Sequence, residues 1–234
     1  MIVLATAHVE SPSAESLMER WATRADRVHA DSRRSRTAQS ASLLARAALR
    51  ALLFSHTAQT EWNFRADSRG KLSAFSTAGE AGPAVCLAHS HGRIACGLGD
   101  VGALGIDIES HRPRNVNAIA DWAFGPQERA TIATGGAAAF YRIWTLREAM
   151  AKATGEGLAL VTDRADRVNG GPESGPWRAR VDGRIWLLEH FSPGRDSSFA
   201  VAALLADDDM VNPTAVRLLD LGDRAGNGAS GGIP

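Results

Sequence analysis

Cysteine is scarce in this chain, which has only Cys86 and Cys96 among its 234 residues. The two flank a predicted turn at 90–93 and could face each other across a hairpin. The sequence is otherwise typical of a cytosolic protein, so we expect reduced thiols in the core and no disulfide framework. The sequence places no base next to either thiol, which argues against a cysteine nucleophile.

Long apolar runs are also absent. No stretch of about 18 apolar residues occurs, and this excludes a membrane-spanning helix. Residues 1–5 lack the basic region of a signal peptide and instead predict a strand. We therefore expect a cytoplasmic protein that has no membrane partner.

Neither sign of charge is in excess. The chain has 26 Lys and Arg residues and 26 Asp and Glu residues, so its formal net charge is zero. Its short basic run at Arg33, Arg34 and Arg36 is typical of a solvated face. Nucleic-acid binding depends on a wider basic surface that neutralises phosphates. We therefore expect no nucleic-acid partner.

Hydrophobic residues make up 44% of the chain, which is enough for a proper core. Hydrophobic periodicity and turn residues predict a similar order of elements in each half of the chain. The expected helices are 14–30, 37–53, 116–122 and 137–153, the last ending at Gly155. The expected strands are 2–7, 85–88, 94–98, 103–108, 177–181, 185–190 and 199–204, with a hairpin turn at 182–183.

These elements predict an α+β fold with two pseudo-symmetric lobes, each a small, mostly antiparallel sheet packed against a long helix. We assign residues 1–101 to an N-terminal lobe and residues 102–221 to a C-terminal lobe. The Gly-rich segment 222–234 is expected to be a flexible tail, and segment 164–176 a loop. A cleft between lobes is the expected ligand site, which a monomer can complete.

The segment 104–157 is the most informative part of the sequence. Asp107 and Glu109 are two residues apart in a predicted strand, so their side chains should lie on one face. Glu148 and Lys152 are four residues apart in a predicted helix and should also share a face. Either pair alone is more often a solvated surface than a functional site. If the strand and the helix meet, three carboxylates and one ammonium converge.

This convergence predicts a metal site. Three carboxylates at one place cannot all stay ionised without a cation, because each raises the pKa of the others. Mg²⁺ prefers oxygen ligands and commonly shares its coordination shell with substrate phosphates. The pattern therefore predicts that Asp107, Glu109 and Glu148 bind Mg²⁺, or alternatively Mn²⁺, beside a phosphate chain.

The two motifs resemble those of the surfactin-type 4′-phosphopantetheinyl transferases. In that family the pattern G-[IV]-D-[IVL]-E is followed further along the chain by W-x-x-K-E-A-x-x-K-x-x-G-x-G. This chain departs from the second pattern at Arg147, where lysine is usual, while Phe124 and Glu128 resemble the family's F-x-x-x-E element. The matching residues are Gly105, Asp107, Glu109, Trp144, Glu148, Ala149, Lys152, Gly155 and Gly157.

Upstream residues extend the resemblance. Residues 87–92 are similar to the family's S-H-S element, with Ala88 in place of the first serine. Residues 70–71 are similar to its G-K-P element, with Leu72 in place of proline. The resemblance implies that the 3′-phosphate and adenine end of coenzyme A is bound by Arg36, Lys71, His89 and Ser90. A different interpretation of His89 and His91 is zinc chelation by H-x-H on a strand, but no further ligand pair lies nearby in the sequence.

The resemblance implies a Mg²⁺-dependent transfer of the 4′-phosphopantetheine arm of coenzyme A to a serine of an apo acyl or peptidyl carrier protein, which releases 3′,5′-ADP. Asp107, Glu109 and Glu148 would hold the metal on the pyrophosphate, and Asp107 and Lys152 would also contact coenzyme A. Glu148 would take the serine proton, directly or through water, and whether it serves as metal ligand, as base or as both is open at this point. Lys152 would stabilise charge on the phosphoryl oxygens. Glu128 would lie further out on the metal side. The carrier could belong to fatty-acid, polyketide or nonribosomal-peptide synthesis.

Two other functions are open on the sequence. A different coenzyme A enzyme, such as an acyltransferase, would need a base for the thioester side, and the acidic trio would then be unexplained. A degenerate, non-catalytic module that binds coenzyme A or a carrier protein would fit the changes at Leu72, Ala88 and Arg147. Retention of the acidic trio and of Lys152 favours catalysis.

Overall fold

The computed structural model describes residues 1–155, 171, 175–205 and 216–221. The chain divides into two compact units, of which unit 1 comprises Met1–Asp100 with Thr214–Pro234 and unit 2 comprises Val101–Pro213. Each unit contains a sheet and one long helix that packs on it, which confirms the predicted α+β class. Among the described helices, none is both long and apolar enough to cross a membrane.

Unit 1 is built on a six-stranded sheet with the strand order β10-β1-β5-β4-β3-β2. Neighbouring strands are antiparallel, except that β1 and β10 run parallel. The strands are β1 (Ile2–His8), β2 (Trp62–Ala66), β3 (Leu72–Ser76), β4 (Ala81–Ser90), β5 (Arg93–Gly99) and β10 (Val216–Asp220).

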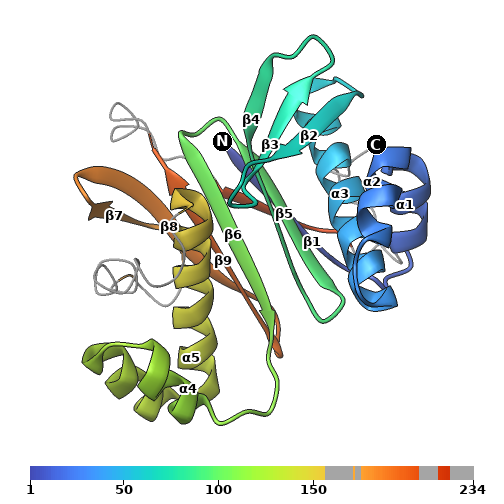
Figure 1. The fold of residues 1–234 in the computed structure, drawn as a ribbon. Helices are drawn as coiled ribbons and strands as arrows, with labels where there is room; N and C mark the ends of the chain where they lie inside the picture. Colours follow the sequence, from blue (N-terminus) through green and yellow to red (C-terminus); the bar gives the residue numbers. More distant parts are fainter. Residues whose placement is uncertain (156–170, 172–174, 206–215, 222–234) are drawn as a thin grey trace. The chain divides into compact units, whose positions relative to one another are not determined.

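The helix α3 (Arg36–Thr57) lies against this sheet, and α1 (Ala14–Trp21) and α2 (Arg24–Asp31) pack on α3 (Figure 1). The Ser35 side chain accepts a hydrogen bond from the Ala38 N–H and so caps the start of α3. Ala and Leu residues of α3 fill the core against β1, β4 and β5. The long helix predicted at 37–53 is therefore confirmed and is longer at both ends.

The single helix predicted at 14–30 is wrong. The chain breaks after Trp21, because Thr23 begins a new helix with a capping box. Its side chain accepts from the Asp26 N–H, and the Asp26 carboxylate accepts from the Thr23 N–H. α1 and α2 are therefore separate helices.

The strands β2, β3 and β10 are not among those that the sequence predicts. The last of these changes the division of the chain, because Val216–Asp220 pairs with β1 and so belongs to unit 1. Residues 102–221 had been predicted to form one lobe, but its last strand lies in the sheet of the other unit. The expected tail at 222–234 and most of the expected loop at 164–176 lie outside the described residues.

Cys86 and Cys96 are both buried free thiols, as predicted. They do not face each other, because Cys86 is opposite Gly97 and Leu87 is opposite Cys96. Side chains alternate between the two faces of a sheet, so the two thiols lie on opposite faces. The hairpin turn between them is confirmed: His91 and Gly92 have φ values of 48° and 83°.

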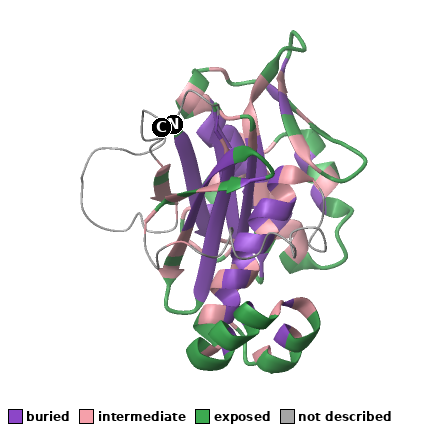
Figure 2. Ribbon diagram, turned by 90° about the vertical axis from the view of Figure 1, so that its left-hand side faces the viewer, coloured by how far each residue is buried: buried purple, intermediate pink, exposed green. Residues whose placement is uncertain are grey.

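Unit 2 contains a four-stranded antiparallel sheet with the order β6-β9-β8-β7. The strands are β6 (Ala103–Ser110), β7 (Trp177–Val181), β8 (Arg184–Gly194) and β9 (Ser197–Leu204). β7 and β8 are joined by the predicted turn, where Asp182 and Gly183 have positive φ. Figure 2 shows buried central strands, in contrast to the mainly exposed helices at the lower end of the view.

Two helices complete unit 2: α4 (Val116–Ala123) and α5 (Pro126–Thr154). The helix α5 starts eleven residues before the predicted 137–153 helix, with proline in its first turn, and it ends at Gly155 as predicted. Its C-terminal half packs on β6 and β9 through Leu146, Ala149, Met150 and Ala153.

Candidate active site

The strand β6 carries the first pair of predicted site residues. Asp107 lies opposite Ala200, and Glu109 lies opposite Ser198, so both side chains are on one face of the sheet. Ala200 and Ala202 of β9 are on this face and pack against α5. The prediction that Asp107 and Glu109 lie side by side on a strand, facing a helix, is confirmed.

Gly105 allows the helix to approach this strand closely. A Cβ atom at Gly105 would lie closer than 3.0 Å to the Ala149 carbonyl oxygen and the Ala153 backbone nitrogen. No real Cβ atom tolerates such contacts with backbone, so the glycine brings α5 directly onto β6. The glycine of the first motif is therefore a packing requirement that sets the distance between the two motifs.

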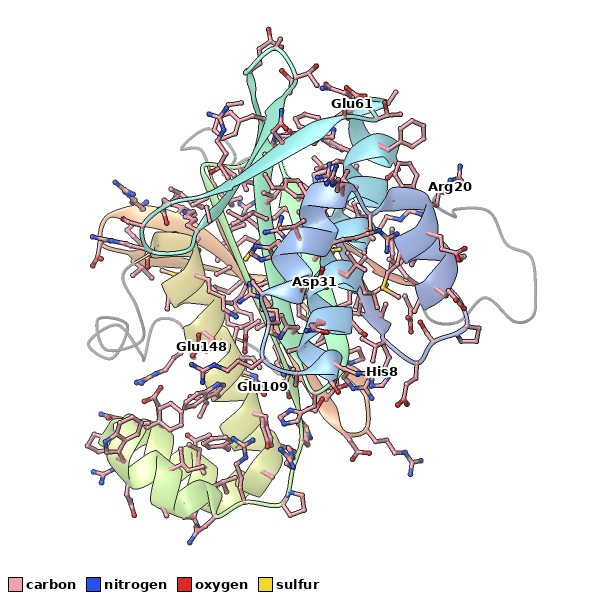
Figure 3. The ribbon with its side chains drawn as sticks, turned by 45° about the vertical axis from the view of Figure 1, so that its right-hand side comes forward. His8, Arg20, Asp31, Glu61, Glu109 and Glu148 are labelled. Carbon is pink, nitrogen blue, oxygen red and sulfur yellow. The ribbon has the colours of Figure 1, made fainter. Side chains whose placement is uncertain are left out.

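The helix α5 supplies the second pair. Lys152 Nζ donates a hydrogen bond of 2.6 Å to Asp107 Oδ1, which joins the helix to the strand. Glu148, one turn earlier, feels the charges of both Lys152 and Glu109. Figure 3 shows Glu109 on β6 and Glu148 on α5 next to each other. The predicted convergence of three carboxylates and one ammonium is present in unit 2.

This group of charges, which we call the acidic cluster (Asp107, Glu109 and Glu148), is short of positive charge. Burial raises the pKa of Asp107 to about 7. The ammonium of Lys152 opposes this rise, and the charges of Glu109 and Glu148 add to it. Burial also raises the pKa of Glu148, and Lys152 lowers it. One ammonium therefore does not compensate for three carboxylates in this partly buried place.

The cluster fits a divalent cation chemically, although it is not a preformed metal site. Among the described residues, no three His, Cys, Asp or Glu side chains form a ready ligand set. Asp107 Oδ1 accepts the hydrogen bond from Lys152. Its Oδ2 is buried and has no hydrogen-bond partner within the described part of the chain. A buried carboxylate oxygen without a partner, beside two more carboxylates, is a donor set that Mg²⁺ or Mn²⁺ prefers.

The expectation that Glu128 lies on the metal side finds no support in its contacts. Glu128 is buried in the first turn of α5, where Oε2 accepts hydrogen bonds from the Gly125 N–H at 3.0 Å and from Arg147 Nη2 at 2.5 Å. A carboxylate at the start of a helix satisfies a free backbone donor and interacts favourably with the helix dipole. Glu128 is a helix cap and an ion-pair partner, not a member of the acidic cluster.

The residues predicted to bind the 3′-phosphate and adenine end of coenzyme A all lie in unit 1, whereas Asp107 and Lys152, the other predicted coenzyme A contacts, lie in unit 2. Arg36 is exposed at the first position of α3, and Lys71 is in the turn between β2 and β3. His89 and Ser90 are consecutive on β4, so their side chains point to opposite faces of the sheet. His89 is exposed on the α3 side, whereas Ser90 is buried and its Oγ lies 3.1 Å from His91 Nδ1. The zinc interpretation of His89 and His91 gains no third ligand among the described residues.

Sequence reasoning missed two polar residues beside Glu109. His111 Nε2 and Ser198 Oγ are 2.9 Å apart, and Ser198 is the cross-strand neighbour of Glu109. The His111 ring also stacks on Tyr141 of α5, with ring centroids 4.3 Å apart. The alternation of side chains that groups Asp107 with Glu109 also places His111 on the same face. The spacing of these three residues in the sequence could therefore have predicted that His111 lies near Glu109.

Comparisons with known proteins agree with the motifs in this unit. A relative, the 4′-phosphopantetheinyl transferase HetI of Nostoc sp. (strain PCC 7120), is 32% identical over 105 residues, which cover 43% of this chain and 44% of the relative. The match therefore spans less than half of the relative's length. The surfactin-type branch stays a prediction. Residues 103–203, which include the acidic cluster and Lys152, match the model of the 4′-phosphopantetheinyl transferase superfamily and confirm the relation that the motifs indicated.

Proposed function

We propose that this protein transfers the 4′-phosphopantetheine arm of coenzyme A to a serine of an apo acyl or peptidyl carrier protein and releases 3′,5′-ADP. The observation that carries the proposal is the joining of both family motifs in unit 2. Lys152 reaches Asp107, and Glu148 stands beside Glu109. The superfamily match covers the same residues. HetI, which is 32% identical over 105 residues, is itself named a 4′-phosphopantetheinyl transferase.

A divalent cation, Mg²⁺ or alternatively Mn²⁺, would be held by Asp107, Glu109 and Glu148. When bound, it supplies Lewis-acid neutralisation of the pyrophosphate charge. The unpartnered Asp107 Oδ2 and the raised pKa values of Asp107 and Glu148 support this role, because a cation would relieve both. Asp107 would also lie against coenzyme A through the same pyrophosphate.

Two residues of α5 would act on the reacting atoms. The serine oxygen forms the new bond to the phosphorus that carries the pantetheine arm, and the bond from this phosphorus to the oxygen of 3′,5′-ADP breaks. Glu148 would accept the serine proton, directly or through water. Because a tight metal ligand is a poor base, binding of the cation and acceptance of the proton are alternative roles for this residue. Lys152, whose side chain is 34% exposed, would turn from Asp107 to the phosphoryl oxygens.

Unit 1 would bind the other end of coenzyme A. Arg36 offers a planar set of donors and Lys71 a point charge, both suited to the 3′-phosphate. Of the two neighbours on β4, His89 is the better candidate because it is exposed, whereas Ser90 is buried and close to His91. We assign Ser90 to support of this turn and keep its contact with the cofactor as the alternative.

The proposal includes a cytoplasmic, monomeric enzyme. The main competing function is a degenerate module that binds coenzyme A or a carrier protein without turnover. The Asp107–Lys152 pair and the charged surroundings of Glu148 favour catalysis, because a binding module has no use for a buried carboxylate short of positive charge.

The test is a mass measurement. The protein is incubated with coenzyme A, Mg²⁺ and a panel of apo carrier proteins from fatty-acid, polyketide and nonribosomal-peptide synthesis. We expect one carrier or more to gain one phosphopantetheine, and EDTA and Glu148→Gln to abolish the gain. Binding of coenzyme A without any gain would identify the binding module. Neither gain nor binding would reject the proposed function.

A further inference from the structure

The helix α5 is interrupted. Gly136 has φ 61° and ψ −144°, a conformation open essentially to glycine alone, and it separates residues 126–135 from residues 137–154. The helix α4 packs with α5, and apolar side chains of α4 and of both segments form one cluster. We call α4 and the first segment the arm (residues 116–135). The second segment carries Glu148 and Lys152. Continuous helical hydrogen bonding therefore does not hold the arm to the segment that bears Glu148.

Arg147 bridges this interruption. It is a fully buried side chain of the second segment, and its Nη2 donates to Glu128 Oε2 at 2.5 Å, on the arm. Its Nη1 donates to the Ala123 carbonyl oxygen, the last residue of α4, at 3.0 Å. The guanidinium carbon lies 4.8 Å from the centroid of the Phe124 ring. One side chain thus contacts the end of α4, the connection to α5 and the first turn of α5.

These contacts need arginine. A guanidinium presents several donors in a planar fork and stacks on aromatic rings, whereas an ammonium is a compact point charge on a flexible stem. The two Arg147 acceptors are on different elements, Ala123 and Glu128, and the Phe124 face lies alongside. The replacement of the family's lysine by Arg147 therefore suits a structural clamp in this chain.

The clamp acts next to the candidate base. Glu148 follows Arg147 directly, so any rotation of the second segment that moves one moves the other. Close contact with Gly105 fixes how near the helix lies to β6. The rotation of the helix about its own axis decides where Glu148 points. Its packing on β9 and the Lys152–Asp107 hydrogen bond restrain this rotation on the sheet side. The directional bonds of Arg147 to the arm add a second restraint from another face of the helix.

We propose that Arg147 and Glu128 are positioning residues whose buried pair holds the second segment of α5 in the rotation that presents Glu148 to Asp107 and Glu109. The effect on phosphopantetheine transfer rests on the proposed function. The effect on cation binding by the acidic cluster does not depend on the proposed function. A measurement of cation binding therefore tests the positioning role separately from the transfer reaction.

The experiment compares four proteins: wild type, Glu128→Gln, Arg147→Lys and the double variant E128L/R147L. Replacement of a whole buried ion pair by apolar residues of similar size is often neutral for stability, whereas removal of one partner is costly. The double variant therefore leaves no unpaired buried charge, although the Gly125 N–H and the Ala123 carbonyl oxygen lose these side-chain partners. Three quantities are measured on each protein: the melting temperature, the Mn²⁺ affinity by electron paramagnetic resonance, and kcat and KM for coenzyme A.

We expect the double variant to melt at a moderately lower temperature than wild type, because the helix cap at Gly125 is lost, and to bind Mn²⁺ less tightly. Its kcat should fall by about tenfold or more, because small misplacements of a reacting group carry such costs. Its KM for coenzyme A should change little. Arg147→Lys, which keeps the charge opposite Glu128 but loses the planar fork and the contact with the Phe124 ring, should be intermediate in both Mn²⁺ affinity and kcat.

The matched control is Ile132→Val, a fully buried position on the arm that leaves the clamp intact. It should lower the melting temperature without changing Mn²⁺ affinity or kcat. The proposal is overturned if the double variant keeps wild-type Mn²⁺ affinity and kcat, or if the control loses both to the same extent. If wild type shows no transfer, the proposed function fails, and the Mn²⁺ affinities alone still decide whether the pair positions Glu148.

Discussion

Lys152 Nζ and Asp107 Oδ1 are joined by a hydrogen bond of 2.6 Å across the interface between α5 and β6. The Asp107 side chain is almost fully buried, while that of Lys152 is one-third exposed. The pair therefore has a fixed acceptor and a donor that can reach solvent. This asymmetry suits a lysine that neutralises the cluster in the free protein and turns to substrate phosphates when they bind.

Replacement of Lys152 should separate these two roles. Lys152→Met leaves Asp107 buried without its donor, so we expect a loss of about 1–3 kcal/mol in the free energy of unfolding. The transfer rate should fall by about a hundredfold, because a preorganised charge on the phosphoryl group is lost. Urea unfolding and the carrier mass assay measure the two effects. Lys152→Arg, which keeps the charge, should recover most of the stability, and an unchanged transfer rate in Lys152→Met would contradict the assigned role.

The acidic cluster was predictable because its signals are local. The period of two on a strand groups Asp107 with Glu109, and the period of about four on a helix groups Glu148 with Lys152. Both patterns survive in the structure. The meeting of the two elements came from the family resemblance, and Gly105 shows its physical cause, a helix backbone in direct contact with the strand.

Features that depend on long-range pairing were not predictable. β10 is recognisable only through its parallel pairing with β1, at the other end of the chain. The opposed faces of Cys86 and Cys96 depend on a register that differs by one residue from the facing arrangement. The Arg147–Glu128 pair joins residues 19 positions apart across the break at Gly136, and no helical period connects them.

Arg50 makes a second buried ion pair, in unit 1, that we expect to be purely structural. Its Nε donates to Asp26 Oδ2 at 2.7 Å, and its Nη1 donates to the Trp62 carbonyl oxygen, so it ties α2 and β2 to α3. Arg50→Met leaves the Asp26 carboxylate largely without its partner and should cost about 3–5 kcal/mol of unfolding free energy.

Arg46→Met is the matched comparison, because Arg46 reaches the same carboxylate only at 3.4 Å. Its cost should be clearly smaller by urea unfolding. Neither variant should change the Mn²⁺ affinity of unit 2, and equal costs for the two arginines would refute the structural assignment.

His190 makes the stability of unit 2 dependent on pH. Burial lowers the pKa of His190 to about 4, and the charges of Arg142 and His111 add to the effect. The unfolded chain then binds a proton on His190 below about pH 6.5, whereas the folded chain binds it only below about pH 4. The free energy of unfolding therefore falls as the pH drops from about 6.5 to about 4.

The difference between wild type and His190→Gln isolates this effect. Its size should be about 1–3 kcal/mol, and it should develop between about pH 6.5 and 4 in urea unfolding of the two proteins. Above this window, the difference between their unfolding free energies should be constant. A difference that stays constant down to pH 4 would mean that His190 titrates normally in the folded protein.

Gly105 should tolerate no side chain. Gly105→Ala forces a Cβ atom against backbone atoms of Ala149 and Ala153, which cannot move as a flexible side chain would, so α5 must lift from β6. We expect a loss of about 3 kcal/mol or more in the free energy of unfolding, which is at the upper end of the cost of overpacking a buried position. The lift also separates Lys152 from Asp107, so Mn²⁺ affinity and transfer should fall together.

Gly102→Ala is the control, because there a Cβ atom first meets the Leu204 side chain at 3.1 Å, and that side chain can turn aside. Equal effects of the two substitutions would show that close contact at Gly105 does not set the geometry of the acidic cluster.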